Sequence, residues 1–171
     1  MPEDKGPAES LQGLIDRSWR RAGASLRAAW PEEHRMTAER LLSFCQEQRH
    51  CVLGVAAGDR APLLVPVSFH LAPSGTIWLP TGSGSVRLAV LRRNPRATVI
   101  VGQPLSDHHR VVLASGPAAP VESLTVPHAV AGAAEMKLGT LEWAEWWIRL
   151  MPVRLLGYDT GSAGSLRTSP R

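Results

Sequence analysis

The N-terminal part of the chain carries a helical pattern of apolar positions. Between Ser10 and Trp30 apolar residues recur every three or four positions, which predicts one amphipathic helix. Pro31 ends this helix, because the residue before a proline is pushed out of helical backbone geometry. Thr37 is expected to cap a second helix that runs from residue 38 to residue 48.

From residue 51 onward the pattern changes to short apolar runs with a period of two. Such runs, bounded by glycine, proline and asparagine, predict about six strands. We expect these strands at residues 51–57, 62–71, 76–81, 97–101, 110–121 and 148–158. Helices are expected at 86–93, between the third and fourth strands, and at 126–138. Because hairpins join most of the strands, the pattern predicts a mainly β fold with helices (α+β), a small antiparallel barrel with helices packed outside it.

The second predicted strand and the loop after the third form the best candidate ligand site. Pro66 lies inside the second strand, which indicates an edge strand or a place where a ligand replaces a neighbouring strand. The sequence Gly-Ser-Gly-Ser at 82–85 opens the predicted helix 86–93. Backbone N–H groups and the helix dipole at such a helix start favour an anion.

Side chains around this loop strengthen the anion-binding hypothesis. Ser83 and Ser85 carry hydroxyl donors, and Arg87 lies one turn into the helix, where its guanidinium can contact a phosphate. Together these groups suit a phosphorylated ligand whose flat part lies along residues 65–68. The same residues also fit an ordinary strand-to-helix turn with a capping serine and a solvated arginine. Neither a Walker loop nor a GxGxxG motif is present.

Composition narrows the range of partners. The 171 residues carry a formal net charge of +4, with 44% hydrophobic and 20% charged residues, which is typical of one globular domain. A basic balance of this size indicates an anion-friendly surface rather than a nucleic-acid partner. No apolar run approaches the roughly 18 residues that a membrane span needs, and the N-terminus has no apolar signal core. We therefore expect no nucleic-acid partner, no membrane segment and a cytoplasmic location.

Cys45 and Cys51 are predicted to be buried thiols. They do not form a CxxC pair, and no second cluster of cysteine and histidine completes a zinc site. Asp107, His108 and His109 suggest a metal site, but adjacent histidines at the end of a strand point apart. We therefore expect no metal site.

Five motifs follow one another in an order typical of one known family. They are P-x-x-x-P-V-x-F (62–69), SGTIWLPT (74–81), GS-x-R-x-x-x-L-x-x-NPRATV (84–99), RVVLASGPA (110–118) and W-x-R-x-x-P-x-R (147–154). In this succession, over residues 37–158, the chain resembles the FMN-binding split-barrel superfamily, the pyridoxamine 5′-phosphate oxidase-like proteins. The helix that closes in L-x-x-NP between the third and fourth strands is characteristic of that superfamily.

The resemblance implies a fold and a domain organisation. The fold is a six-stranded antiparallel split β-barrel of Greek-key type. The resemblance places a flavin-binding barrel at residues 37–159, and the helical pattern before it makes residues 1–36 an N-terminal helical extension. Residues 160–171 have no apolar pattern and are expected to form a flexible tail. Proteins of this fold are normally obligate homodimers with two sites at the subunit interface. The long N-terminal extension is similar to actinobacterial branches of the superfamily, whose members use FMN, a deazaflavin or sometimes haem.

The resemblance also implies roles for residues at matching positions. Arg110 matches a position that contacts the cofactor from the partner subunit. Trp147 and Arg154 match late positions that approach the flavin across the dimer. In the family, the second strand lies against the flavin ring; this flavin-ring strand matches Val65, Pro66, Val67 and Ser68. The end of the third strand and the following loop bind the flavin phosphate; this phosphate site matches Pro80, Thr81, Ser85 and Arg87, with Ser83 in the same loop.

Two departures separate the chain from the oxidases of the superfamily. Their loop serine is followed by a basic pair, whereas this chain has Val86-Arg87 and lacks one positive charge. Their substrate-phosphate motif Arg-Leu-His-Asp is replaced by Arg-Leu-Met-Pro at 149–152. A true pyridoxine-phosphate oxidase is therefore not expected.

The resulting hypothesis is a flavin-dependent oxidoreductase that transfers hydride between bound FMN, or a deazaflavin, and an unidentified small molecule. In such an enzyme the flavin supplies the reactivity and the protein supplies position and electrostatics. His70 and Arg154 are the candidate catalytic side chains. The alternative hypothesis is a non-catalytic flavin- or haem-binding protein on the same fold. For haem, the candidate axial ligands are His70, His108, His109 and His128.

Overall fold

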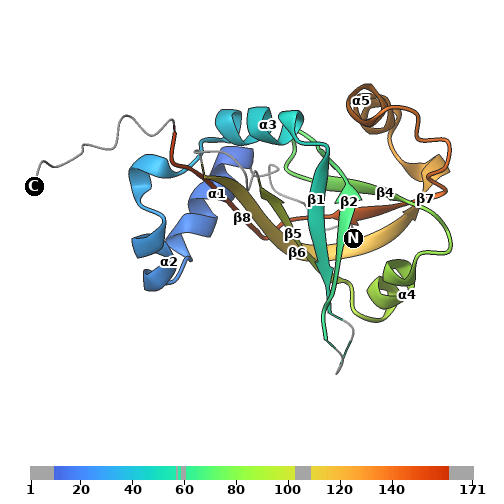
Figure 1. Cartoon of the computed structure of the whole chain (residues 1–171), viewed down its shortest axis with the longest axis horizontal. Coiled ribbons are helices and arrows are strands. Elements are labelled where there is room, and N and C mark those ends of the chain that lie inside the picture. The colour runs from blue at the N-terminus through green and yellow to red at the C-terminus, as the bar shows by residue number, and fades with distance from the viewer. Residues whose placement is uncertain (1–9, 57, 59–60, 103–108, 162–171) are drawn as a thin grey trace, which may run out of the picture.

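The computed structural model describes residues 10–56, 58, 61–102 and 109–161. They form an antiparallel sheet that curls into a half-barrel, with helices around it (Figure 1). The helices of this part of the chain are α1 (Leu11–Arg20), α2 (Ala24–Ala29), α3 (Ala38–Glu47), α4 (Val86–Arg93) and α5 (His128–Leu138), with the 3-10 turns η1 (Glu32–His34) and η2 (Ser123–Thr125). None of these helices has the length and apolar character that crossing a membrane requires.

The strands follow one path through the sheet. They are β1 (His50–Val55), β2 (Leu63–Ser68), β3 (His70–Leu71), β4 (Ile77–Thr81), β5 (Arg96–Gly102), β6 (Arg110–Glu122), β7 (Trp146–Leu150) and β8 (Arg154–Asp159). Their order is β2-β1-β5-β6-β7-β4-β3, with β8 paired to β6 off this path, and the neighbours are antiparallel. β2 lies at one end of the order, so it is an edge strand, as the position of Pro66 predicts.

The long strand β6 joins the two halves of the sheet. Its first part pairs with both β5 and β8, and from Ala118 onward it pairs with β7. Where the partner changes, a Cβ on Gly116 would meet the carbonyl oxygen of Met151 and the backbone nitrogen of Val153 inside normal contact distance. Position 116 therefore requires glycine, because the connection between β7 and β8 passes directly against the β6 backbone.

Two predicted strands are each divided in two, so the sheet has eight strands within the described ranges rather than six. The second predicted strand breaks at Phe69, whose N–H donates to the Arg49 carbonyl and whose carbonyl accepts from Lys137. These hydrogen bonds satisfy the backbone groups of Phe69 in place of the hydrogen bonds to a neighbouring strand. The last predicted strand breaks between β7 and β8, where Pro152 has no backbone donor for a ladder.

The single helix predicted before Pro31 is two helices. α1 ends at Arg20, and α2 begins after Gly23, its N-cap residue. The spacing of apolar residues hides this break, because Ala22 is apolar and buried like the inner face of α1. The pattern therefore identified the buried face of α1 correctly, but not the end of the helix, and no residue of α2 is buried.

Other predicted boundaries are confirmed. Thr37 caps α3, because its hydroxyl oxygen accepts a hydrogen bond from the Arg40 N–H at 3.4 Å. α4 spans residues 86–93 as predicted. α5 ends before Gly139, whose φ of 91° is a left-handed value that glycine adopts without strain.

The N-terminal helix packs into the same core as the barrel. Leu14 and Trp19 of α1 belong to one cluster with side chains of the barrel strands. The buried Ser18 adds a polar link, since its Oγ accepts from the Leu155 N–H of β8 at 2.9 Å and donates to the Leu14 carbonyl at 2.7 Å. α1 is therefore fixed against β8 by apolar packing and by hydrogen bonds.

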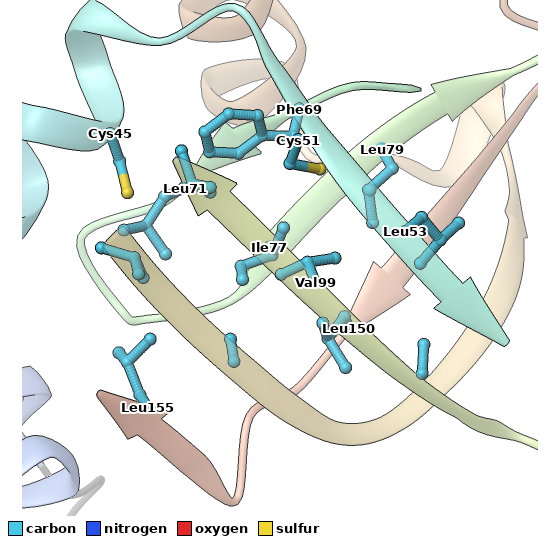
Figure 2. Packing of buried hydrophobic residues seen from close by; sticks show 14 of the residues in the cluster. Cys45, Cys51, Leu53, Phe69, Leu71, Ile77, Leu79, Val99, Leu150 and Leu155 are labelled. Atoms are coloured by element: carbon cyan, nitrogen blue, oxygen red, sulfur yellow. The ribbon is translucent and has the colours of Figure 1, made fainter. Parts of the chain in front are cut away.

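The core of the half-barrel is apolar and includes both cysteines. Leu53, Phe69 and Val99 lie in it together with Cys45 of α3 and Cys51 of β1 (Figure 2). The two cysteines are free and buried, as predicted. Burial raises the pKa of each thiol to about 12. The thiols therefore stay protonated near neutral pH, which makes them poor nucleophiles.

Candidate functional site

The end of β4 and the start of α4 form the predicted loop site. Thr81, the last residue of β4, is buried, with 1% of its surface exposed. The loop 82–85 follows, and its last residue, Ser85, is the N-cap of α4. Leu88 and Leu91 are buried and fix α4 on the barrel. The backbone therefore presents the loop at a helix start, as the sequence predicts.

Arg87 turns back from α4 toward the end of β4. Its Nε and Nη2 donate hydrogen bonds to Thr81 Oγ1 at 3.1 and 2.9 Å. Burial of the guanidinium lowers the pKa of Arg87 from its usual value, yet arginine remains protonated in proteins. A hydroxyl is a neutral acceptor, so this contact positions the charge of Arg87 without neutralising it.

The loop leaves room for a ligand. Among the described residues, a Cβ added at Gly82 or at Gly84 would meet nothing within 4 Å, so the backbone there faces open space. The Ser85 side chain makes no capping hydrogen bond. Backbone N–H groups, serine hydroxyls and one guanidinium are the donors that a phosphate accepts from. These residues therefore fit the phosphate of a flavin.

A carboxylate that the sequence did not single out lies at the same loop. The Ser83 N–H donates to Glu145 Oε2 at 2.8 Å. Hydrogen bonds from Ser83 lower the pKa of the Glu145 carboxyl from its usual value. Glu145 directly precedes β7, and β7 pairs with β4 so that Trp146 lies opposite Thr81. Only this long-range pairing brings the carboxylate to the loop, and no local sequence signal indicates it.

The four residues that match the flavin-ring strand lie on β2 but not on one face. Pro66 is exposed, and Val65 and Ser68 are partly buried. The Val67 side chain lies in the core, with 6% of its surface exposed. A ligand along this edge strand can contact Pro66 and the backbone, but the core encloses the Val67 side chain.

Pro80 and Trp147 lie opposite each other on β4 and β7. Trp147 is 2% exposed, and its Nε1 donates to Ser123 Oγ at 3.3 Å. It packs in a second apolar cluster together with Ala134 of α5. Within this chain, Trp147 is therefore a packing residue.

Arg110 and Arg154 lie on the paired strands β6 and β8 rather than on β4 or α4. Arg110 forms an ion pair with Glu47 at 3.1 Å, and its guanidinium lies 4.9 Å from the centre of the Phe44 ring. Arg154 is exposed and lies opposite Ser115. The predicted site residues that the structure gathers on β4, the loop and α4 are Pro80, Thr81, Ser83, Ser85 and Arg87.

His70, the candidate catalytic histidine, is buried on β3 opposite Trp78 of β4. Among the described residues, its Nδ1 has no hydrogen-bond partner. Burial lowers the pKa of His70, and the positive charge of Lys137 lowers it further. His70 is therefore a neutral imidazole enclosed by its own chain.

Lys137 of α5 is a partly buried ionisable group for which the sequence offers no signal. Its Nζ donates to the carbonyl oxygens of Cys45 and Phe69 at 2.8 and 3.0 Å and lies 3.9 Å from the centre of the Phe69 ring. Burial lowers the pKa of Lys137 to about 8. The side chain joins α5 to the end of α3 and to the break between β2 and β3.

Asp107 and His108 lie outside the described residues, so a metal or haem role for that loop is untested. His109 packs against the Tyr158 ring, with 6.1 Å between ring centres. His128 is exposed at the start of α5. Within the described ranges, no group of three or more histidine, cysteine, aspartate or glutamate side chains is placed to hold a metal ion.

Comparison with known proteins identifies the family to which the chain belongs. The pyridoxamine 5′-phosphate oxidase family model matches residues 37–142. The chain therefore belongs to the pyridoxamine 5′-phosphate oxidase family, and its fold is the split barrel that the sequence motifs predict. No curated protein matches the sequence.

Solved structures share this fold at low sequence identity. The conserved hypothetical protein Rv2991 from Mycobacterium tuberculosis is 23% identical, with a TM-score of 0.67 and coverage of 83% of this chain and 96% of that one. The FAD binding protein from Mycobacterium smegmatis is 16% identical, with a TM-score of 0.57 and coverages of 74% and 99%. A FAD-binding protein from Mesorhizobium loti is 18% identical, with a TM-score of 0.59 and coverages of 73% and 94%. At these identities the similarity establishes the fold.

Proposed function

We propose that the protein is a flavin-dependent oxidoreductase that transfers hydride between bound FMN, or a deazaflavin, and an unidentified small molecule. The observation that carries the proposal is the loop 82–85 at the start of α4. Its glycines face open space, and the Arg87 guanidinium is held beside it by hydrogen bonds to Thr81. Membership of the pyridoxamine 5′-phosphate oxidase family supports a flavin phosphate as the anion. Two of the structural neighbours are named as FAD-binding proteins, which supports a flavin.

In this proposal the residues of the chain bind and orient the cofactor. The loop N–H groups and the Ser85 hydroxyl donate to the phosphate, and Arg87 reaches it from its position on Thr81. The edge strand β2 offers Pro66 and unpaired backbone groups to the flat ring. When bound, the flavin supplies the hydride chemistry. The two departures from the oxidase motifs argue against pyridoxine phosphate as the substrate.

Titration of the purified protein with FMN and with a deazaflavin tests this proposal. We expect one of them to bind, to give the protein its absorption spectrum, and to exchange hydride with NAD(P)H or with an electron acceptor. A protein that binds neither contradicts the proposal. A Soret band in the purified protein would instead support the haem-binding alternative.

We also propose that two copies of the chain form a homodimer that completes the cofactor site. Strands β2, β1 and β5 lie side by side and present Leu64, Val52 and Ile100 on one face, with 66%, 41% and 45% of their surfaces exposed. Val52 lies opposite Ile100, and Leu64 lies opposite Gly54, so the three side chains share this face. A contiguous exposed apolar face is typical of an interface between subunits.

Light scattering is expected to give twice the mass of one chain. Ile100→Glu places a charge on the proposed interface and is expected to give monomers, because burying an unpaired carboxylate is costly. Leu124→Glu is the matched control, since Leu124 is 98% exposed on η2, outside this face, and the dimer is expected to persist. A monomeric wild-type protein contradicts the proposal.

The proposed location is the cytoplasm. Cys45 and Cys51 are free thiols rather than partners in a disulfide. Unpaired cysteines are typical of reducing compartments, which supports this location.

A further inference from the structure

The loop that is proposed to bind a phosphate already holds an anionic group of its own chain. The Ser83 N–H donates to Glu145 Oε2 at 2.8 Å. The backbone donor of Ser83 is therefore used by a carboxylate at the position where a phosphate is expected.

The backbone of Glu145 is fixed, whereas its side chain can move. The Glu145 carbonyl accepts from the Ser123 N–H at 3.0 Å, and the next residue, Trp146, lies opposite Thr81 in the β4–β7 pair. The Glu145 side chain itself is exposed to solvent. Because an exposed side chain has little packing to lose, the carboxylate can leave the loop without a movement of β7.

The contact differs from an ordinary helix cap. A carboxylate at a helix start normally comes from the N-cap residue or from the first turn of the same helix. The first turn of α4 has no acidic residue, and the N-cap Ser85 makes no side-chain capping bond. Glu145 reaches this helix start from the residue directly before β7, 62 positions from Ser83. It therefore supplies the negative charge at the start of α4.

We propose that Glu145 is an internal latch of the anion site: its carboxylate occupies the loop until the phosphate of the cofactor displaces it. This inference rests on the proposed function, because it concerns the same loop. The latch competes only with an anionic group, so Glu145 sets the affinity for phosphorylated ligands and leaves contacts with the flavin ring unchanged.

The expected effect follows from the fraction of molecules in which the loop is open. A latch that is closed in about nine of ten molecules raises the apparent Kd about tenfold, because only the open fraction binds. A displaced carboxylate that stays near the phosphate also repels it, and salt screens this repulsion. Removing the charge of Glu145 is therefore expected to tighten FMN binding.

Calorimetric titrations with FMN and with riboflavin, which lacks the phosphate, test the latch. Glu145→Gln keeps the size of the side chain and removes its charge, and Glu145→Ala removes the acceptor as well. Both variants are expected to bind FMN about tenfold more tightly than the wild type and to bind riboflavin with unchanged affinity. The matched control is Glu142→Gln, which makes the same charge change at an exposed residue of the same segment and is expected to bind FMN like the wild type.

Equal FMN affinities of the wild type and Glu145→Gln overturn the latch and leave the proposed function standing. Weaker FMN binding by Glu145→Ala also overturns it, because the carboxylate would then hold the loop in its binding conformation. If neither the wild type nor any variant binds FMN or a deazaflavin, the proposed function fails, and inorganic phosphate tests the latch alone. The Ser83 amide signal in NMR spectra is expected to respond at about tenfold lower phosphate in Glu145→Gln than in the wild type, and equal responses overturn the latch.

Discussion

Replacing Arg87 with alanine is expected to weaken FMN binding roughly 10- to 150-fold, because a hydrogen bond to a charged group contributes about 1.5–3 kcal/mol. The guanidinium is held on Thr81 Oγ1 by two donors, so its charge is already positioned at the start of α4. The missing basic residue at position 86 increases this dependence, since no neighbouring cation of a basic pair can replace Arg87. Fluorescence titration with FMN measures the effect.

The matched control is Arg92→Ala, which removes the same charge from the same helix. Arg92 is exposed in the last turn of α4, and its guanidinium lies 5.1 Å from the centre of the Trp146 ring. We expect a much smaller loss of FMN affinity in this variant. Equal losses in the two variants would mean that the phosphate does not bind at the start of α4.

Gly116→Ala is expected to lower the free energy of unfolding by about 3 kcal/mol, at the upper end of the usual cost of overpacking. The added Cβ would meet the Met151 carbonyl oxygen and the Val153 nitrogen, which are backbone atoms and cannot turn away as a flexible side chain can. Urea denaturation measures the change. In a thermal scan the midpoint is expected to fall by roughly 10 °C for a domain of this size.

Gly132→Ala provides the contrast for this substitution. Gly132 lies inside α5, and a Cβ there meets nothing within 4 Å among the described residues. Alanine is favoured over glycine in a helix by about 1 kcal/mol, so this variant is expected to be slightly more stable than the wild type. A Gly116→Ala protein as stable as the wild type would contradict the close approach of the β7–β8 connection.

The parts of the fold that local signals specify were predictable from the sequence. The bounds of α4 follow from the Gly/Ser loop before it and the Asn94-Pro95 pair after it, and the structure places the helix at the predicted residues. The N-cap of α3 at Thr37 follows from side-chain chemistry in the same way. The order of the motifs predicts membership of the split-barrel family, and the family model that matches residues 37–142 confirms this prediction.

The parts that depend on distant contacts were not predictable. The break at Phe69 depends on Lys137, which is 68 positions away, and periodicity within one strand contains no information about it. The position of Glu145 depends in the same way on the pairing of β7 with β4. Alternation along β2 separates its two faces but does not say which one the core covers, and only the structure places Val67 in the core and Pro66 outside it.

The packing of α1 against β8 has a consequence for the synthesis of the protein. α1 is translated early, but β8, which the Ser18 hydrogen bond joins to α1, is translated late. Until β8 has left the ribosome, the apolar face of α1, which includes Leu14 and Trp19, lacks one of the elements against which it packs. Contacts between segments far apart in sequence slow folding, and exposed apolar surface on an incomplete chain favours aggregation. We therefore expect α1 to dock in a late step, which makes the nascent chain dependent on chaperones until the sheet is complete.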